Sequence, residues 1–259
     1  MLTAGIDIGS VATKALLLQD REILATAVVP TGSRPKLSAA TALAQAMHAC
    51  GLQTGAVQRT VSTGYGRRVV EFGDQTITEI SACALGTVFW GSPRGRIRTI
   101  IDLGGQDIKV ISLGTNDEVA DFVMNDKCAA GTGRFLEVMA RALEVPLEDL
   151  GPLAAKSEKV ITVNATCTVF AESEVISLLA QEAAKEDIIA GIHRAIAERI
   201  LAMTHKTGLL EIVAFNGGGA KNTGLCAALE AKLGLELAIP ENPQLVNALG
   251  SALAAQRLG

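Results

Sequence analysis

Short apolar runs that end on a polar residue and then on glycine occur at three places along the chain. Residues 4–9 (AGIDIG), 99–105 (TIIDLGG) and 211–219 (EIVAFNGGG) each predict a β-strand followed by a glycine turn. After the first two turns the chain returns as a second apolar strand, at 15–18 and 109–113, so each of these turns is the tip of a hairpin. Strand-to-glycine turns are therefore the main regularity of the sequence.

Apolar residues recur at helical spacing through the rest of the chain, which predicts a series of helices. They cover residues 38–49, 79–88, 134–143, 169–180, 187–207 and 224–233, with a last alanine-rich helix from 245. A further strand is predicted at 59–63. The pattern breaks at 91–95 (GSPRG) and then restarts with a strand, an aspartate, glycines and a lysine, as at the beginning of the chain. We interpret this as an internal duplication that makes two related α/β lobes facing each other across a cleft.

Composition removes two classes of function. The 259 residues carry a formal net charge of -4 and 3% aromatic residues, without a block of lysine or arginine, so the charged and stacking surface of a nucleic-acid-binding protein is missing. No apolar run reaches the roughly 20 residues that a membrane-spanning helix needs. Residues 1–7 contain neither a basic region nor a cleavable apolar segment. We therefore expect a soluble protein of the cytoplasm, with neither nucleic acid nor membrane as partner.

Glycine turns of this kind suit phosphate binding, because backbone N–H groups can surround an anion where no side chain intervenes. A single such turn more often only reverses the chain. Here three turns accompany two carboxylates, Asp7 and Asp102, and the sequence has no Walker-type GxxxxGK[ST] motif. A carboxylate beside phosphates holds Mg²⁺ through its waters. We therefore expect one aspartate to anchor the metal and the other to orient the attacking water.

The residues around the turns resemble those of a known superfamily. Residues 5–10 with Thr13 and Lys14, residues 101–107 and residues 216–219 are similar to the two phosphate loops and the adenosine loop of the acetate kinase, sugar kinase, heat-shock protein and actin superfamily. The resemblance implies an α/β protein with the actin-like ATPase fold, in which two ribonuclease-H-like lobes face an ATP cleft.

In this fold the first lobe would span residues 1–95, completed by a C-terminal helix at 245–259, and the second would span 96–244. The second lobe would carry the cluster ligands described below and the adenosine loop. The residues implied to bind ATP in the three loops are Gly9, Ser10, Thr13, Lys14, Gly104, Gly105, Gln106, Asp107, Gly217, Gly218 and Gly219.

Two of the five cysteines stand in contexts that favour thiolate over thiol. The sequence has no CxxC pair, and Cys50, Cys83 and Cys226 lie in apolar helical contexts where a buried, unreactive thiol is the ordinary outcome. By contrast, Cys128 and Cys167 have polar neighbours and each precedes a predicted helix, whose N-terminus stabilises negative charge. Gly131 and Gly133 form a further anion-binding nest beside Cys128, which we expect to contact the ATP phosphates.

The segments that contain these two cysteines, 124–136 (MNDKCAAGTGRFL) and 166–174 (TCTVFAESE), resemble the signature of the activator component of 2-hydroxyacyl-CoA dehydratases. The resemblance covers essentially the whole chain, including 62–67 (STGYGR) and 187–193 (DIIAGIH). It implies a homodimer with one [4Fe-4S] cluster between its subunits, each subunit donating two thiolates. A cubane cluster takes four thiolates, so a two-fold axis through the cluster completes the set.

Carried over residue by residue, the ligands are Cys128 and Cys167, with ATP or ADP and Mg²⁺ as the other cofactors. The implied function is ATP-driven donation of one low-potential electron to an iron-sulfur dehydratase, with ferredoxin or flavodoxin as the electron source. Activators of benzoyl-CoA reductases or of double-cubane-cluster reductases are similar and stay open as alternatives. A small-molecule kinase and a nucleotide switch without redox chemistry are further alternatives on the same fold.

Overall fold

The computed structural model describes residues 1–53, 55–125, 129–163 and 167–258. The chain forms two compact units. Unit 1 contains Met1–Ile97, Leu113–Ala120 and Pro240–Gly259, and unit 2 contains Arg98–Ser112 and Asp121–Ile239. The turn within 113–120 belongs to unit 1, whereas the predicted lobe boundary assigns it to the second lobe.

Unit 1 is built on five strands, β1 (Leu2–Ile8), β2 (Ala12–Gln19), β3 (Glu22–Pro30), β4 (Arg59–Thr63) and β5 (Gln75–Thr76). They form one sheet in the order β3-β2-β1-β4-β5. The β1–β2 and β2–β3 pairs are antiparallel, and the β1–β4 and β4–β5 pairs are parallel. The carboxyl ends of β1 and β4 therefore lie side by side, which brings the segments that follow them together.

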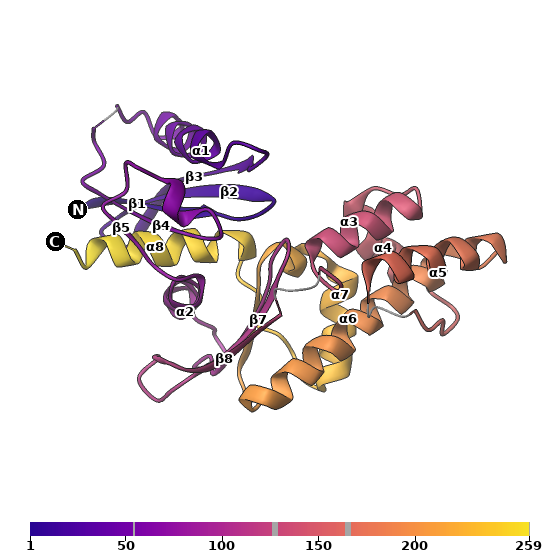
Figure 1. Cartoon of the computed structure of the whole chain (residues 1–259). Coiled ribbons are helices and arrows are strands. Elements are labelled where there is room, and N and C mark those ends of the chain that lie inside the picture. Colours follow the sequence, from indigo (N-terminus) through magenta and orange to yellow (C-terminus); the bar gives the residue numbers. More distant parts are fainter. Residues whose placement is uncertain (54, 126–128, 164–166, 259) are drawn as a thin grey trace. The chain divides into compact units, whose positions relative to one another are not determined.

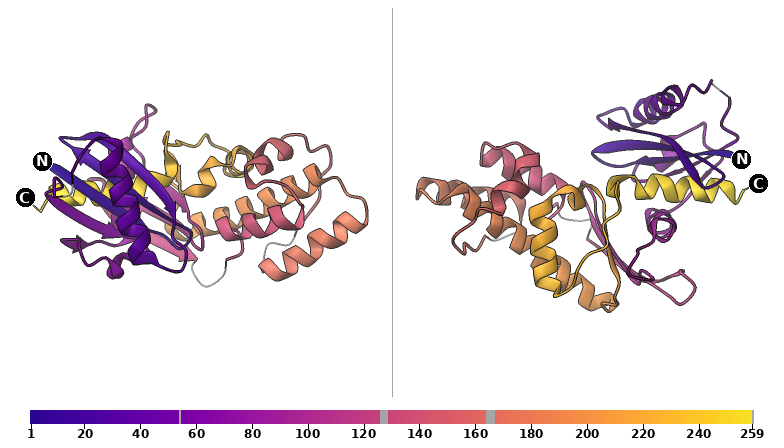
Figure 2. Two further views of the ribbon diagram at one scale, coloured as in Figure 1. Left: turned by 90° about the horizontal axis from the view of Figure 1, so that it is seen from above. Right: turned by 180° about the vertical axis from the view of Figure 1, so that it is seen from behind.

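Helices cover both faces of this sheet. The helical segments of unit 1 are α1 (Pro35–Ala49), α2 (Glu79–Trp90), α8 (Val246–Gln256) and the short 3₁₀ turns η1 (Arg67–Val69) and η4 (Pro243–Leu245). α1 lies on one face, and α8 with α2 on the other (Figures 1 and 2). Along β2, Ala15 and Leu17 pack toward α1 whereas Leu16 and Leu18 pack toward α8. Burial on both faces explains why β2 is a continuous apolar run.

Close packing of α8 against β1 depends on a glycine. A Cβ atom at Gly5 would overlap the carbonyl group of Ala248. In the same contact the buried Thr3 hydroxyl donates to the carbonyl oxygen of Ala252 at 3.0 Å. Residues far apart in the sequence thus pack against each other in unit 1.

Unit 2 is built on a four-stranded sheet of β6 (Thr99–Leu103), β7 (Ile108–Leu113), β8 (Val119–Asn125) and β9 (Val213–Asn216). The strand order is β8-β7-β6-β9, with β6 antiparallel to β7 and parallel to β9. This central arrangement of a hairpin and a parallel neighbour matches β2-β1-β4 of unit 1. The duplication predicted from the sequence is therefore present in the topology of the two sheets.

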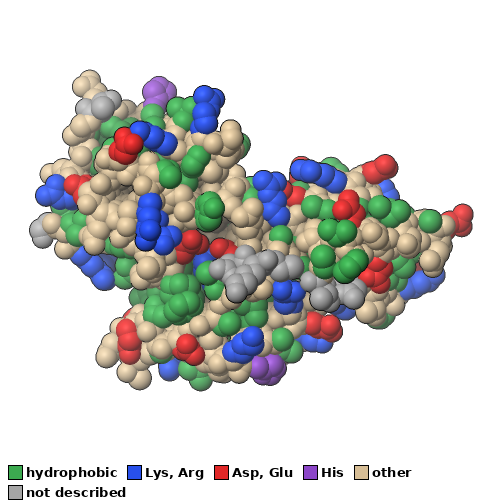
Figure 3. Space-filling model, viewed as in Figure 1, with side chains coloured by type: hydrophobic (Ala, Val, Ile, Leu, Met, Phe, Trp, Pro, Cys, Tyr) green, Lys and Arg blue, Asp and Glu red, His purple; other side chains and the backbone are tan. Residues whose placement is uncertain are grey.

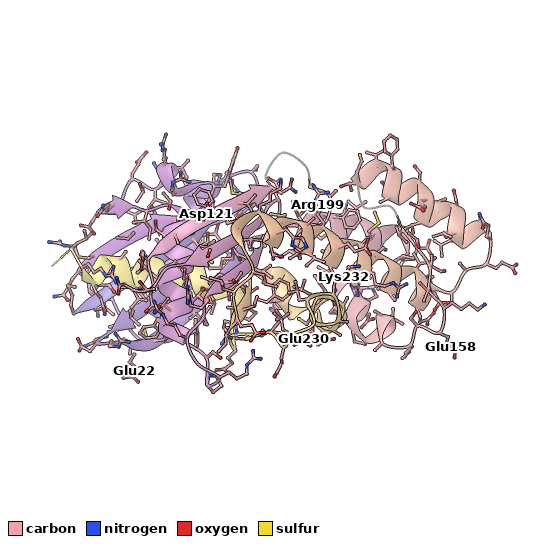
Figure 4. The ribbon with its side chains drawn as sticks, turned by 90° about the horizontal axis from the view of Figure 1, so that it is seen from below. Glu22, Asp121, Glu158, Arg199, Glu230 and Lys232 are labelled. Atoms are coloured by element: carbon pink, nitrogen blue, oxygen red, sulfur yellow. The ribbon has the colours of Figure 1, made fainter. Side chains whose placement is uncertain are left out.

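The helices of unit 2 enclose the larger of the apolar cores, which includes Phe135, Ile192 and Phe215. They are α3 (Gly133–Ala142), α4 (Leu150–Ala154), α5 (Thr168–Ala180), α6 (Lys185–Thr207) and α7 (Thr223–Leu233), with the 3₁₀ turns η2 (Leu147–Asp149) and η3 (Gly218–Lys221). α6 packs along α7, and α3 packs against α5. At the surface of the α6–α7 pair, Lys232 Nζ lies 2.8 Å from Glu198 Oε1 (Lys232 is labelled in Figure 4).

The surface carries charges of both signs. Acidic and basic side chains are interspersed on the face shown in Figure 3. None of the helices in the described part of the chain combines the length and the apolar character needed to cross a bilayer.

A buried histidine joins α6 to the start of α7. His193 Nε2 lies 3.0 Å from Asn222 Nδ2. The Oδ1 atom of Asn222 accepts from the Leu225 N–H, so its amide nitrogen faces His193 and the Nε2 atom must accept. Burial first, and the Arg194 charge second, lower the pKa of His193 to about 4. The imidazole is thus neutral in the folded protein at neutral pH.

This histidine predicts a loss of stability in acid. Since the unfolded chain takes up the proton near pH 6.5 and the folded chain only near pH 4, its contribution to stability is present above about pH 6.5 and is lost as the pH falls toward 4. The full loss is about 3 kcal/mol. The free energy of unfolding, measured with urea at pH 7 and pH 4.5, should therefore fall less in the His193→Gln variant than in the wild type. His48, exposed on α1, is the matched control, and His48→Gln should keep the wild-type dependence. If the His193→Gln variant lost as much stability between pH 7 and pH 4.5 as the wild type, the buried His193 would not be the cause of the loss.

Candidate functional site

The first glycine turn, residues 9–12, joins β1 to β2 in unit 1. The Gly9 N–H donates to the Ala12 carbonyl at 3.1 Å. Just before the turn, Asp7 lies opposite Lys14 in the antiparallel register, and Lys14 Nζ is 2.8 Å from Asp7 Oδ2. The Asp7 side chain is 5% exposed and that of Lys14 is 16% exposed. The predicted carboxylate and the predicted lysine are therefore one nearly buried ion pair at the base of the turn.

The remaining predicted residues of this turn differ in exposure. Ser10 is half-buried at its tip. Thr13 is fully buried, and its hydroxyl lies 2.9 Å from the hydroxyls of both Thr31 and Ser38. A phosphate contact of Thr13 stays a prediction, and the contacts that its hydroxyl makes are internal.

The second glycine turn, residues 104–107, joins β6 to β7 in unit 2. The Gly104 N–H donates to the Asp107 carbonyl at 2.9 Å. Lys109 Nζ lies 2.6 Å from Asp107 Oδ1 and 3.5 Å from Asp102 Oδ2. The side chains of Lys109 and Asp102 are 2% and 4% exposed, whereas that of Asp107 is 24% exposed. One buried ammonium therefore stands between the predicted catalytic aspartate and a carboxylate that solvent reaches.

The third glycine turn, residues 217–219, closes over Asp102. Because β9 is parallel to β6, Asn216 is the register partner of Asp102. Gly217 has φ +83°, and a Cβ atom there would lie 2.7 Å from Asp102 Oδ1. Only glycine combines this left-handed backbone with so close an approach. Gly218 follows with no heavy atom near the position of its missing Cβ, so the tip of the turn is open on that side.

Unit 1 contains a matching turn, residues 64–66, that was not among the predicted site residues. It follows β4 as the third turn follows β9. Gly64 has φ +92°, and a Cβ atom there would lie 2.6 Å from Asp7 Oδ1. Tyr65, 83% exposed, takes the place of the bare Gly218. The sequence contains a strand followed by Gly-x-Gly at this place, which could have indicated the turn. Only the register of the strands shows that the turn lies against Asp7.

The N-terminus of α3 is bonded to the second glycine turn. The Gly133 N–H donates to the Gly104 carbonyl at 2.9 Å, and the Arg134 N–H donates to the Gly105 carbonyl at 2.8 Å. The Thr132 N–H donates to the Ala129 carbonyl at 3.0 Å. In the predicted nest at 131–133, two of the three amides therefore bond to backbone carbonyls. Phosphate contacts of this nest stay a prediction.

Cys167 is the N-cap residue of α5. Its backbone is extended, with φ -141° and ψ 135°, and its half-buried thiol makes no capping hydrogen bond to the helix. The first turn of a helix has free N–H groups and a positive partial charge, which suit an anionic ligand atom. The residue therefore fits a thiolate ligand, because ligation would break no contact with α5. The other predicted ligand, Cys128, lies outside the described residues.

The remaining cysteines differ from Cys167. Cys83 and Cys226 are buried, and burial, with a smaller contribution from Glu230, raises the pKa of Cys226 to about 11. Cys50 is half-buried at the end of α1. Within the described part of the chain, no three His, Cys, Asp or Glu side chains gather as a metal site.

Comparison with known proteins supports one family throughout the chain. The (R)-2-hydroxyglutaryl-CoA dehydratase activating ATPase of Acidaminococcus fermentans is 43% identical over 258 residues, which cover 98% of this chain and 97% of that protein. The activator of lactoyl-CoA dehydratase of Anaerotignum propionicum is 43% identical over 256 residues, with 98% and 97% covered. Equal identity to the activators of two different dehydratases does not favour either acyl group.

Solved structures agree. The activator of the 2-hydroxyisocaproyl-CoA dehydratase from Clostridium difficile, solved with bound ADPNP, has a TM-score of 0.93 at 41% identity, covering 100% of this chain and 95% of that one. A ROK family glucokinase from Streptomyces griseus has a TM-score of 0.63 at 13% identity, covering 99% and 100%, which shows the common fold alone. The predicted actin-like ATPase fold is thus confirmed. Residues 4–255 match the profile of the BadF/BadG/BcrA/BcrD ATPase family, and the chain belongs to that family.

Proposed function

We propose that this ATPase is the activator of an iron-sulfur 2-hydroxyacyl-CoA dehydratase, to which it donates single low-potential electrons at the expense of ATP. The carrying observation is the position of Cys167, a thiol suited to ligation at the start of α5, in the unit that also holds the second and third glycine turns. A kinase would have no use for such a thiol. The full-length likeness to dehydratase activators supports the same conclusion.

The glycine turns of both units contribute to ATP binding in this proposal. Asp7 and Asp102 hold Mg²⁺ through its waters, and one of them orients the attacking water. The near burial of both carboxylates supports this role, since a fixed charge costs little reorganisation during the reaction. Lys14 and Lys109 keep the two aspartates in place and offset their charge.

The ligand set of the cluster requires two copies of the chain. Cys128 and Cys167 of each subunit donate four thiolates in total, and the first turn of α5 stabilises the anionic sulfur of Cys167. The bound [4Fe-4S] cluster supplies one electron at low potential. Ferredoxin or flavodoxin is the proposed source of that electron, and a dehydratase with its own iron-sulfur cluster is the acceptor.

A continuous route within unit 2 supports coupling between the nucleotide and the thiols. The carbonyls of Gly104 and Gly105 receive the first N–H groups of α3, and α3 packs against α5, which begins at Cys167. A shift of the second glycine turn on ATP binding would therefore be passed to the start of α5 through two backbone hydrogen bonds and one helix contact. Different affinities of the two conformations for ATP and ADP supply the driving force.

Anaerobic purification tests the proposed function. We expect a brown dimer that bleaches in air, hydrolyses ATP without a small-molecule acceptor, and reduces a 2-hydroxyacyl-CoA dehydratase only when ATP is present. A colourless protein that phosphorylates a sugar or another hydroxyl compound would instead be a kinase. Absence of iron and sulfide, with ATP-dependent changes of conformation retained, would identify a switch without redox chemistry.

A further inference from the structure

Three buried hydroxyls form a chain beneath the first glycine turn. The Thr31 hydroxyl donates to the Gly9 carbonyl at 2.7 Å and lies 2.9 Å from the Thr13 hydroxyl, which in turn lies 2.9 Å from that of Ser38 in α1. The residues are 8%, 0% and 7% exposed in the order Thr31, Thr13, Ser38. Only Thr13 belongs to the predicted ATP-binding residues. Thr31 and Ser38 lie outside that set.

Each hydroxyl has one proton, and this fixes the two ends of the chain. A carbonyl can only accept, so Thr31 donates to the Gly9 carbonyl and Ser38 donates to the Pro35 carbonyl at 2.9 Å. The Thr13 hydroxyl between them has one proton, which it can donate to either Thr31 or Ser38. The chain is therefore anchored on the Gly9 carbonyl at one end and in α1 at the other.

The bond to Gly9 determines where the next amide points. In a planar trans peptide the C=O and the following N–H are directed oppositely. Because Thr31 holds the Gly9 carbonyl toward the buried hydroxyls, the Ser10 N–H is directed away from them, at the half-buried tip of the turn. An N–H in a glycine turn that faces outward is the donor that a phosphate oxygen requires. Thr31 also donates its own N–H to Val11, the residue after Ser10, at 2.9 Å, which fixes the other side of the turn.

We infer that Thr31 is a positioning residue for the nucleotide, which aims the Ser10 N–H at a phosphate of ATP by holding the Gly9 carbonyl. The inference rests on the proposed role of the first glycine turn in ATP binding. Thr31 itself does not touch the ligand. It fixes the orientation of one peptide plane before the nucleotide binds, which reduces the conformational entropy that is lost on binding.

The test compares ATP affinity in the whole protein with three variants. Thr31→Val keeps the shape of the side chain and removes the hydroxyl, and we expect the dissociation constant for ATP, measured by titration calorimetry, to rise about tenfold. Thr31→Ser restores the hydroxyl and should restore the affinity. Thr3→Val is the matched control, because it also removes a buried threonine hydroxyl from unit 1, one that bonds to the Leu18 and Ala252 carbonyls away from the turn.

The control separates positioning from stability. Thr3→Val should lower the melting temperature about as much as Thr31→Val while leaving ATP affinity unchanged. The inference is wrong if Thr31→Val binds ATP like the wild type, if Thr31→Ser is as weak as Thr31→Val, or if Thr3→Val weakens binding equally. Since binding is read without a dehydratase, failure of the proposed electron transfer would appear separately and would leave this result unaffected.

Discussion

Replacing Cys167 by serine is expected to reduce the iron content of the anaerobically purified dimer from about four atoms to nearly none. Serine removes the thiolate but is among the best N-cap residues, so α5 should begin as before or be slightly stabilised. Loss of the helix therefore cannot explain loss of iron. Iron and acid-labile sulfide analysis, with the absorbance of the cluster, provide the measurement.

The matched control is Cys50→Ser. Cys50 is also a half-buried free thiol at a helix end, but it belongs to unit 1 and its Sγ contacts the Ala46 and Met47 carbonyls at 3.4 Å. This variant should retain the wild-type iron content and ATP-dependent reduction of a dehydratase. If Cys167→Ser retained the full cluster, Cys167 would not be a ligand and the proposed dimeric ligand set would have to be abandoned.

Replacing Lys109 by methionine is expected to lower the free energy of unfolding by about 3–5 kcal/mol. Methionine has nearly the length of lysine but no charge, so Asp102 and Asp107 would keep their negative charges without the ammonium between them. Removing one member of a buried ionic group costs far more than removing a surface ion pair, because a buried charge that remains, here that of Asp102, stays desolvated. Urea unfolding at neutral pH measures the effect, and ATP hydrolysis should be lost as well.

Two further variants show whether buried charge is the cause. Lys14→Met removes the equivalent ammonium of unit 1, which is more exposed and pairs with one carboxylate among the described residues, so its cost in stability should be smaller. Asp102→Asn added to Lys109→Met should recover part of the loss, because the negative charge of one of the two carboxylates is then removed. If the Lys109→Met variant were as stable as the wild type, the buried ammonium would not stabilise the fold.

The strand-to-glycine turns were predictable because local chemistry alone determines them. Strands 59–63 and 99–103 were predicted with their observed bounds, since each is a short run rich in β-branched residues that is followed directly by glycine. Helices with clear starts, such as α5 after Cys167, were predicted to within one residue. The ionic partner of Asp7 was also foreseeable in part, because the tip of a hairpin brings positions 7 and 14 into register.

Features that depend on contacts between distant segments were not predictable in this way. β3 and β8 were missed, and both are edge strands with many exposed residues whose place depends on pairing with one neighbouring strand. The turn at 64–66 meets Asp7 only because β4 pairs in parallel with β1. Likewise, Thr13 has a hydroxyl suited to phosphate, but the positions of β3 and α1 bury it among other hydroxyls.

The packing of α8 on β1 has a consequence for the synthesis of this protein. β1 leaves the ribosome long before α8, the helix that covers one face of it, and Gly5 and Thr3 meet Ala248 and Ala252 only after α8 has been made. Unit 2 contains no residue beyond Ile239 and can form while the chain is still being extended. Until α8 has been made, the sheet of unit 1 exposes an apolar face. That face would be a binding surface for a chaperone.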